Sequence, residues 1–121
     1  MMAAPRAHRL PRNRRLKDRR QFVRARAEGR RVAKGCLIAN WLTLPPGSPS
    51  RIGVITGRKL GNAVVRNRAR RLLREAFRLH QQELREPVDL ILIARASIVG
   101  RKFSEVDRDF LNLLRQAELL P

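Results

Sequence analysis

The chain has 121 residues, and its 28 Lys and Arg against 10 Asp and Glu give a formal net charge of +18. This length allows one small domain. An apolar fraction of 43% is enough for a hydrophobic core, which excludes a purely disordered basic tail. Residues 1–74 carry 21 of the cations but only Asp18 and Glu28 of the acids. Such a one-sided charge repels itself in the free protein and predicts a polyanionic partner.

Composition also excludes several other classes. The longest apolar run, around 88–94, is too short to span a membrane, and residues 1–16 lack the apolar core of a secretory signal. Cys36 is the single cysteine, so no disulfide framework is possible, and we expect a cytoplasmic protein. His8 and His80 are too far apart in the sequence to form a zinc motif with Cys36, so no metal site is predicted.

The expected elements follow in chain order. Residues 1–16 are predicted to be a flexible basic arm, and 17–121 a single domain. Asp18 and Gln21 have the spacing of a capping box, which predicts a short helix that ends at Gly29. The next elements are strands over 30–33, 36–44 and 51–56, a long helix over about 63–83, a strand over 88–95 and a final helix.

The order α-β-β-β-α-β-α predicts an α/β (α+β) sandwich, with one sheet and helices packed against it. The strand over 88–95 is apolar almost throughout, so we expect it to be buried on both faces. Ser104, with Asp107 three residues later, is predicted to cap the final helix. The strands over 51–56 and 88–95 could lie parallel, and such a crossover is right-handed in nearly all proteins.

The segment 64–78 predicts a helix with two opposite faces. At about 100° per residue, one face is apolar: Val65, Ala69, Leu72, Leu73, Ala76 and Phe77. The opposite side, which we call the arginine face, carries Arg66, Asn67, Arg68, Arg70, Arg71, Arg74 and Arg78.

The arginine face favours contact with a nucleic acid over an ordinary solvated surface. Four of its arginines follow one another at i,i+4 spacing, and like charges at that spacing destabilise a helix. The phosphates of a partner would relieve this repulsion. Arginine outnumbers lysine 24 to 4, which is mild support for RNA. The amide of Asn67 could contact a base edge or a 2′-OH, or be an ordinary surface side chain.

One string in this region resembles a known signature. The string consists of Lys59-Leu-Gly-Asn-Ala-Val-Val65, then Arg66-Asn67-Arg68, then Arg70, Arg71 and Arg74. These residues and their intervals resemble the signature of the bacterial ribonuclease P protein component family. Further matches, which extend the resemblance over about residues 16–115, are Leu16, Lys17, Phe22, Gly29, Val32 and the strand 91–95. The resemblance implies one central, mostly antiparallel sheet with a left-handed βαβ crossover, against the general rule.

The resemblance also implies a function. Members of this family are small subunits of a ribonucleoprotein that removes the 5′ leader of precursor tRNA. The catalyst is the large RNA with Mg²⁺ bound to it, so the protein would be a non-catalytic subunit of an endoribonuclease and would hold no cofactor itself. We find no catalytic triad, carboxylate pair or metal cluster in the sequence, in agreement with this implication. No membrane and no obligate protein partner are expected.

Two sets of binding residues come from the family pattern. The RNA subunit would be bound by Arg66, Asn67, Arg68, Arg70, Arg71 and Arg74. The precursor tRNA leader would stack on Phe22 and contact Lys17, Arg26, Arg58 and Lys59. Arg26 stands where family members often have a second aromatic residue, and the strand position that is often aromatic is Asn40 here, while Trp41 would point to the other face.

Three alternatives stay open at this point. A ribosomal or ribosome-assembly protein would share the basic α/β build and the arginine face. A small DNA-binding protein fits less well, because a recognition helix normally mixes polar residues and follows another helix. Phe22 could also be a core residue that anchors the first helix instead of a stacking platform.

Overall fold

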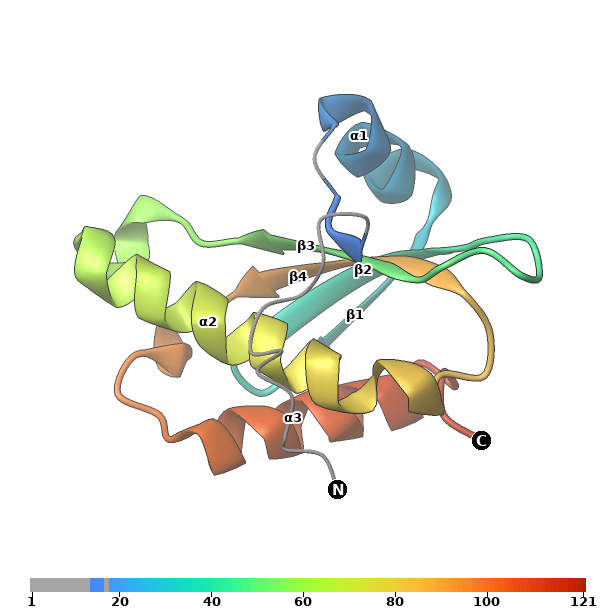
Figure 1. Ribbon diagram of the computed structural model, residues 1–121. Coiled ribbons are helices and arrows are strands. Elements are labelled where there is room, and N and C mark those ends of the chain that lie inside the picture. Colours follow the sequence, from blue (N-terminus) through green and yellow to red (C-terminus); the bar gives the residue numbers. More distant parts are fainter. Residues whose placement is uncertain (1–13, 17) are drawn as a thin grey trace, which may run out of the picture.

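Residues 14–16 and 18–121, which the computed structural model describes, form a four-stranded sheet with α-helices on both faces (Figure 1). The helices and strands are α1 (Arg19–Glu28), β1 (Arg30–Lys34), β2 (Leu37–Thr43), β3 (Arg51–Ile55), α2 (Ala63–His80), β4 (Val88–Ala94) and α3 (Phe103–Gln116). Short 3₁₀ turns are η2 (Arg58–Leu60), η3 (Gln81–Glu83) and η4 (Ala96–Ile98). The expected order of elements is therefore confirmed.

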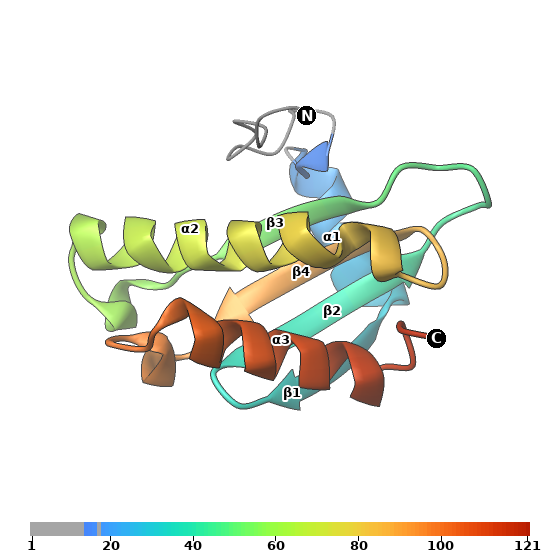
Figure 2. The same cartoon turned by 60° about the horizontal axis from the view of Figure 1, so that its bottom comes forward.

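The sheet order is β1-β2-β4-β3. β2 pairs antiparallel with both β1 and β4, whereas β3 and β4 are parallel and are joined through α2. In Figure 2, β3 runs to the left, α2 returns to the right in front of the sheet, and β4 runs to the left below β3. The crossover from β3 to β4 is therefore left-handed. The fold class is thus confirmed, and this chain is one of the exceptions to the right-handed rule.

Each face of the sheet buries its own set of side chains. α2 and α3 cover one face, where Leu73, Phe77 and Phe110 pack against Leu90 and alternate neighbours in the strands. α1 lies on the other face, over a smaller cluster of Leu16, Ala25 and Ile91, with Phe22, Leu42, Ile55 and Ile93 partly buried around it. β4 lies between the two clusters, which confirms the burial expected from its apolar sequence.

The start of α1 is closed as the sequence predicts. The Asp18 carboxylate accepts a hydrogen bond from the Arg20 N–H at 2.9 Å, and the Gln21 side chain accepts one from the Asp18 N–H at 3.4 Å. The cap determines where α1 begins. Phe22 and Ala25 lie one turn apart on this helix, and both face the sheet.

The start of α3 differs from the prediction. The helix begins at Phe103, and the Glu105 carboxylate accepts a hydrogen bond from the Lys102 N–H at 2.9 Å, so Ser104 lies inside the first turn and is not the cap. The earlier start lets Phe103 pack against the core. Asp107, expected to support the cap, instead contacts His80 of α2 at 2.9 Å.

Residues 14–16, at the end of the predicted arm, pack against the sheet. The Leu16 N–H donates to the Ile52 carbonyl at 2.8 Å, Arg15 forms a parallel bridge with Ile52, and Leu16 is only 7% exposed. These residues pack along the free edge of β3, because that edge offers unpaired backbone groups and Leu16 can join the cluster under α1. The rest of the arm, 1–13, and Lys17 lie outside the described residues.

His80 joins the end of α2 to α3. Its Nδ1 lies 2.7 Å from Glu83 Oε2, and its Nε2 lies 2.9 Å from Asp107 Oδ1. Burial by itself lowers the pKa of His80, but the hydrogen bonds and charges of Glu83 and Asp107 outweigh it, so the pKa is raised above its ordinary value of 6.5. The protonated ring can donate to both carboxylates at once.

We predict that His80 makes stability depend on pH. Because its pKa is higher in the folded chain, its contribution is fully present below the unfolded pKa and is lost as the pH rises through the folded pKa. Urea unfolding of the wild type and of His80→Gln should therefore differ more at about pH 5.5 than at about pH 8.5. A difference that is constant over this range would contradict the protonated bridge.

Candidate nucleic-acid interface

A hollow of about 360 Å³ opens between α1 and the edge of β3, and we call it the Phe22 hollow. It is lined by Arg15, Leu16, Phe22, Ile52, Gly53, Val54 and Arg74. Four segments that are distant in the sequence thus contribute to it: the strand-like piece before α1, α1 itself, β3 and the middle of α2. Its lining combines one aromatic ring with two guanidinium groups.

The ring of Phe22 lies directly on the backbone of β3 at Gly53. A Cβ atom at position 53 would come within 2.5 Å of Phe22 Cζ and 2.6 Å of Cε1, so only glycine leaves room for the ring. The ring is half-buried: part of it packs in the cluster under α1, and part lines the hollow. Both interpretations of Phe22, core anchor and stacking platform, are therefore compatible with its position.

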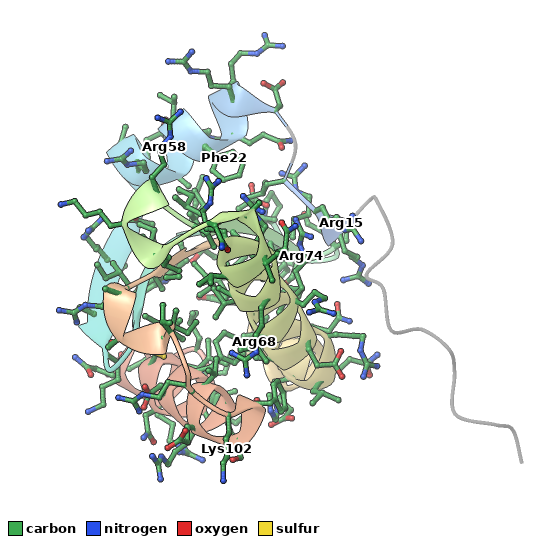
Figure 3. The ribbon with its side chains drawn as sticks, turned by 90° about the vertical axis from the view of Figure 1, so that its left-hand side faces the viewer. Arg15, Phe22, Arg58, Arg68, Arg74 and Lys102 are labelled. Carbon is green, nitrogen blue, oxygen red and sulfur yellow. The ribbon has the colours of Figure 1, made fainter. Side chains whose placement is uncertain are left out.

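Arg74 faces the Phe22 hollow together with Arg15 (Figure 3). The pKa of Arg74 is lowered, first by burial and then by the positive charges of Arg15 and Arg70. Arg15 Nε is buried without a hydrogen-bond partner, and none of the ion pairs found among the described residues involves Arg15 or Arg74. Repulsion between these guanidinium groups would be relieved by an anion in the hollow.

The other side of the arginine face points toward α3. Figure 3 shows Arg68 there, on the side of α2 away from Arg15 and Phe22. Arg68 Nη2 donates to the Arg101 carbonyl at 2.9 Å, which holds its guanidinium against the segment before α3. Asn67 and Arg71 are exposed, and Asn67 Oδ1 accepts from Arg70 Nη1 at 2.6 Å.

The arginine face is therefore divided by the neighbours of α2. Arg66, Arg70 and Arg74 follow at i,i+4 spacing and form one row, whose last member reaches the Phe22 hollow. Arg68, which contacts the segment before α3, and Arg71, which is exposed, form a second row. Arg78 is paired with Glu75 at 2.7 and 2.8 Å, and this hydrogen bonding raises its pKa.

The remaining candidate leader residues are less closely grouped. Arg58 and Lys59 are exposed in η2, just after β3, and Figure 3 places Arg58 on the same side of α2 as Phe22. Arg26 is exposed near the end of α1 and does not line the Phe22 hollow. Lys17 lies outside the described residues.

Asp89 and Cys36 have structural roles. Asp89, only 4% exposed, accepts two hydrogen bonds of 2.8 Å from Arg51, which joins the start of β3 to the start of β4. Cys36 is buried, and burial raises the pKa of its thiol to about 12, so it is not a nucleophile near neutral pH. In the described part of the chain, no three His, Cys, Asp or Glu side chains are placed to hold a metal ion.

None of the described helices is long and apolar enough to cross a lipid bilayer. Trp41 points away from α1, as expected, and is buried in the larger core, with the Arg30 guanidinium 5.7 Å from its ring centre. Asn40 faces the α1 side of the sheet, where its side chain bonds to Arg30 and Arg31. The α1 side of β2 therefore presents an amide at the position that the family pattern often fills with an aromatic ring.

Comparison with known proteins identifies the family. The family model described as Ribonuclease P matches residues 10–118. The chain belongs to the ribonuclease P protein family. Membership makes it a subunit of an endoribonuclease of tRNA processing, and it disfavours the ribosomal and DNA-binding alternatives.

Relatives and solved structures of the family cover nearly the whole chain. The ribonuclease P protein component of Symbiobacterium thermophilum is 42% identical over 88% of this chain and 92% of its own length. That of Gluconacetobacter diazotrophicus is 43% identical over 94% of each chain. Among structures, the RNase P protein of Staphylococcus aureus has a TM-score of 0.80 at 26% identity, covering 89% of this chain and 98% of its own. The Thermotoga maritima RNase P protein has a TM-score of 0.75 at 29% identity, covering 84% and 96%.

Of the residues that line the Phe22 hollow, only Phe22 and Arg74 are predicted from the sequence as site residues. Arg15 looked like one more cation of the arm, and nothing local marks it as part of a site. Gly53 carried a usable signal, because a glycine inside an apolar strand indicates a close approach by another group. The contact with Phe22 itself joins residues that are far apart in the sequence, so no local pattern predicts it.

We predict that Gly53→Ala displaces Phe22 from β3. The added methyl group would overlap the ring, and such overpacking destabilises a fold by about 1–3 kcal/mol. Urea unfolding should show this loss, whereas Gly57→Ala, where an added Cβ meets nothing within 4 Å, should stay within about 0.5 kcal/mol of the wild type. Equal stability of both variants would show that Phe22 does not depend on this contact.

Proposed function

We propose that this ribonuclease P protein binds the catalytic RNA subunit and the single-stranded 5′ leader of precursor tRNA at the same time. It would thereby assist removal of the leader by the RNA, to give the mature 5′ end. The observation that carries the proposal is the division of the arginine face: one row of cations reaches the Phe22 hollow, and the other points toward α3. A single helix can thus contact two RNA strands.

The RNA subunit is assigned to the exposed part of the arginine face. Arg68 and Arg71 are accessible to phosphates, and the Arg101 carbonyl fixes the direction of the Arg68 guanidinium before any RNA is bound. Fixing a guanidinium in advance lowers the conformational entropy that binding would otherwise cost. Asn67 directly precedes Arg68, is exposed, and supplies an amide for a base edge or a 2′-OH.

The leader is assigned to the Phe22 hollow. The accessible part of the Phe22 ring can stack on one base, and stacking tolerates any base, as a leader of variable sequence requires. Arg15 lines the same hollow together with Arg74, which the family pattern assigns to the RNA subunit. Both guanidinium groups can neutralise a phosphate next to the stacked base. Lys17, Arg26, Arg58 and Lys59 complete this assignment as contacts farther along the strand. Arg66 and Arg70, in the same row as Arg74, would hold the RNA subunit close to the leader.

The chemistry is assigned to the RNA and to Mg²⁺ held by the RNA. The described acids do not offer a Mg²⁺ site: Asp89 is paired with Arg51, and Asp18 caps α1. What the protein supplies is position and charge, because cations beside both strands reduce their mutual repulsion. Leader removal at low Mg²⁺ should accordingly depend on the protein.

We predict that Arg68→Ala combined with Arg71→Ala weakens assembly with the RNA subunit. Two phosphate contacts would be lost, so the slope of log affinity against log salt should become smaller by about 2. The measurement is a binding titration with the cognate RNA at several salt concentrations. Leader removal from a labelled precursor tRNA at low Mg²⁺ is followed in parallel.

The matched control is Arg108→Ala combined with Arg115→Ala, which removes the same charge from exposed positions on α3. It should leave the salt slope closer to that of the wild type. An equal decrease for both pairs would show a general charge effect and would contradict the assigned surface. If wild-type protein does not stimulate leader removal at low Mg²⁺, the proposed function itself is wrong.

We predict that Phe22→Leu weakens binding of precursor tRNA to the assembled enzyme and spares mature tRNA. Leucine keeps much of the packing under α1 but cannot stack, and loss of stacking on a base costs about 1–3 kcal/mol. Affinities for the two tRNAs are compared in the same titration, with Val23→Ala, an exposed neighbour on α1, as the control. Equal losses for precursor and mature tRNA would make Phe22 a core residue only.

A further inference from the structure

A second, apolar hollow lies between the start of α2 and η4, and we call it the Val64 hollow. It has a volume of about 190 Å³ and is lined by Val64, Val65, Arg68, Ala69, Ile98, Val99 and Gly100. Two of these side chains are unusually exposed for large apolar residues: Val64 is 75% exposed and Val99 is 47% exposed. Of its lining residues, only Arg68 belongs to a surface assigned above.

Local folding does not require apolar residues at the start of α2. The first turn of a helix favours acidic and polar side chains, and valine has a low helix propensity. Here the first turn contains no acid and instead presents Val64 to solvent, while Asn62 closes the helix end by accepting from the Val65 N–H at 3.1 Å. Apolar side chains gathered around an exposed hollow are typical of a binding site.

One cation lines the Val64 hollow, and two more follow its last lining residue, Gly100, in the chain. Arg68 is part of its lining, and its guanidinium donates to the Arg101 carbonyl at 2.9 Å. Arg101 in turn donates from Nε to the Ser97 carbonyl at 3.2 Å, which holds its charge on the segment that carries Ile98 and Val99. Lys102 follows and is exposed. Glu105 is the nearby acid, and one of its oxygens accepts from the Lys102 N–H.

An apolar hollow bordered by cations has the complementary chemistry of one nucleotide. The flat ring of a base suits the valine and isoleucine side chains, and the flanking phosphates suit the guanidinium and ammonium groups. An apolar peptide segment would gain from the hollow but not from the surrounding positive charge. The position also matters, because Arg68 belongs both to this hollow and to the surface assigned to the RNA subunit.

We propose that the Val64 hollow binds one unstacked nucleobase of the RNA subunit, with Arg68, Arg101 and Lys102 contacting the phosphates beside it. This inference rests on the proposed function, and it adds a contact with a base to a surface otherwise made of phosphate contacts. The leader is not the source of this base, because Figure 3 shows Arg68 and Phe22 on different sides of α2. Cations after β4, in the nearly neutral last part of the sequence, thereby join the interface.

The test is Val64→Ser combined with Val99→Ser, in titrations with the RNA subunit at several salt concentrations. Both side chains are exposed, so the fold should be retained, and urea unfolding checks this. The expected result is an affinity about tenfold lower, from the loss of apolar contact. The salt slope should stay unchanged because no charge is removed. Leu79→Ser is the matched control, since Leu79 is 46% exposed on the same helix and lies outside both hollows.

Several results would overturn the proposal. These are an affinity of the double variant within twofold of the wild type, an equal loss for Leu79→Ser, or a loss confined to precursor tRNA. A change in self-association, measured by sedimentation, without a change in RNA affinity would assign the hollow to a second copy of the chain and would also overturn it. Arg68→Ala with Arg71→Ala in the same titration separates failure of the proposed function from failure of the proposal for the hollow. If the arginine pair weakens binding and the valine pair does not, only the proposal for the hollow is wrong.

A crosslinking experiment gives an independent readout. Cys36 is buried and its thiol pKa is about 12, so the thiol of Val64→Cys can be labelled selectively with an aryl azide. In the assembled enzyme, crosslinks should map to one nucleotide or two adjacent nucleotides of the RNA subunit. Crosslinks to the precursor tRNA, or crosslinks spread over many nucleotides, would contradict a single bound base.

Discussion

Burial of one side of α2 against the sheet determines where every cation on its other side can point. Leu73, Ala76 and Phe77 are fully buried, so the helix cannot rotate about its axis without exposing them. The left-handed crossover then places α2 beside β3, with α1 near one flank and α3 near the other. The arginine face is thereby directed to two different surroundings. Neither hollow would exist if the apolar side of α2 were free to turn.

Uncompensated positive charge is the second constraint. Burial lowers the pKa of Arg74, and the charges of Arg15 and Arg70 lower it further. The described acids are mostly engaged elsewhere, as in the pairs Arg51–Asp89 and Arg78–Glu75. The free protein therefore keeps a repulsion that folding alone does not remove. The fold tolerates it because the core and the caps are built from other residues. A polyanion on this surface would gain free energy from relieving the repulsion, in addition to its direct contacts.

Local sequence patterns predicted some features of the fold and the interface correctly and failed where distant contacts decide. The capping box at Asp18 and the two faces of α2 were predictable because both depend on residues within one or two turns of each other. The cap of α3 was predicted wrongly at Ser104, since the packing of Phe103 and the contact between Asp107 and His80 favour an earlier start. A local capping pattern cannot include those distant partners.

The sequence alone determined the excess of positive charge, the arginine face, the order of elements and the resemblance to the ribonuclease P protein family, because composition, helical periodicity and a contiguous motif need no tertiary contact. The tertiary structure decided the rest. It placed Phe22 on Gly53, Arg15 beside Arg74, and Arg68 on the Arg101 carbonyl. Each of these pairs joins residues more than 30 positions apart. Burial of the two clusters on either side of the sheet brings them together, and nothing in the local pattern of either partner specifies the other.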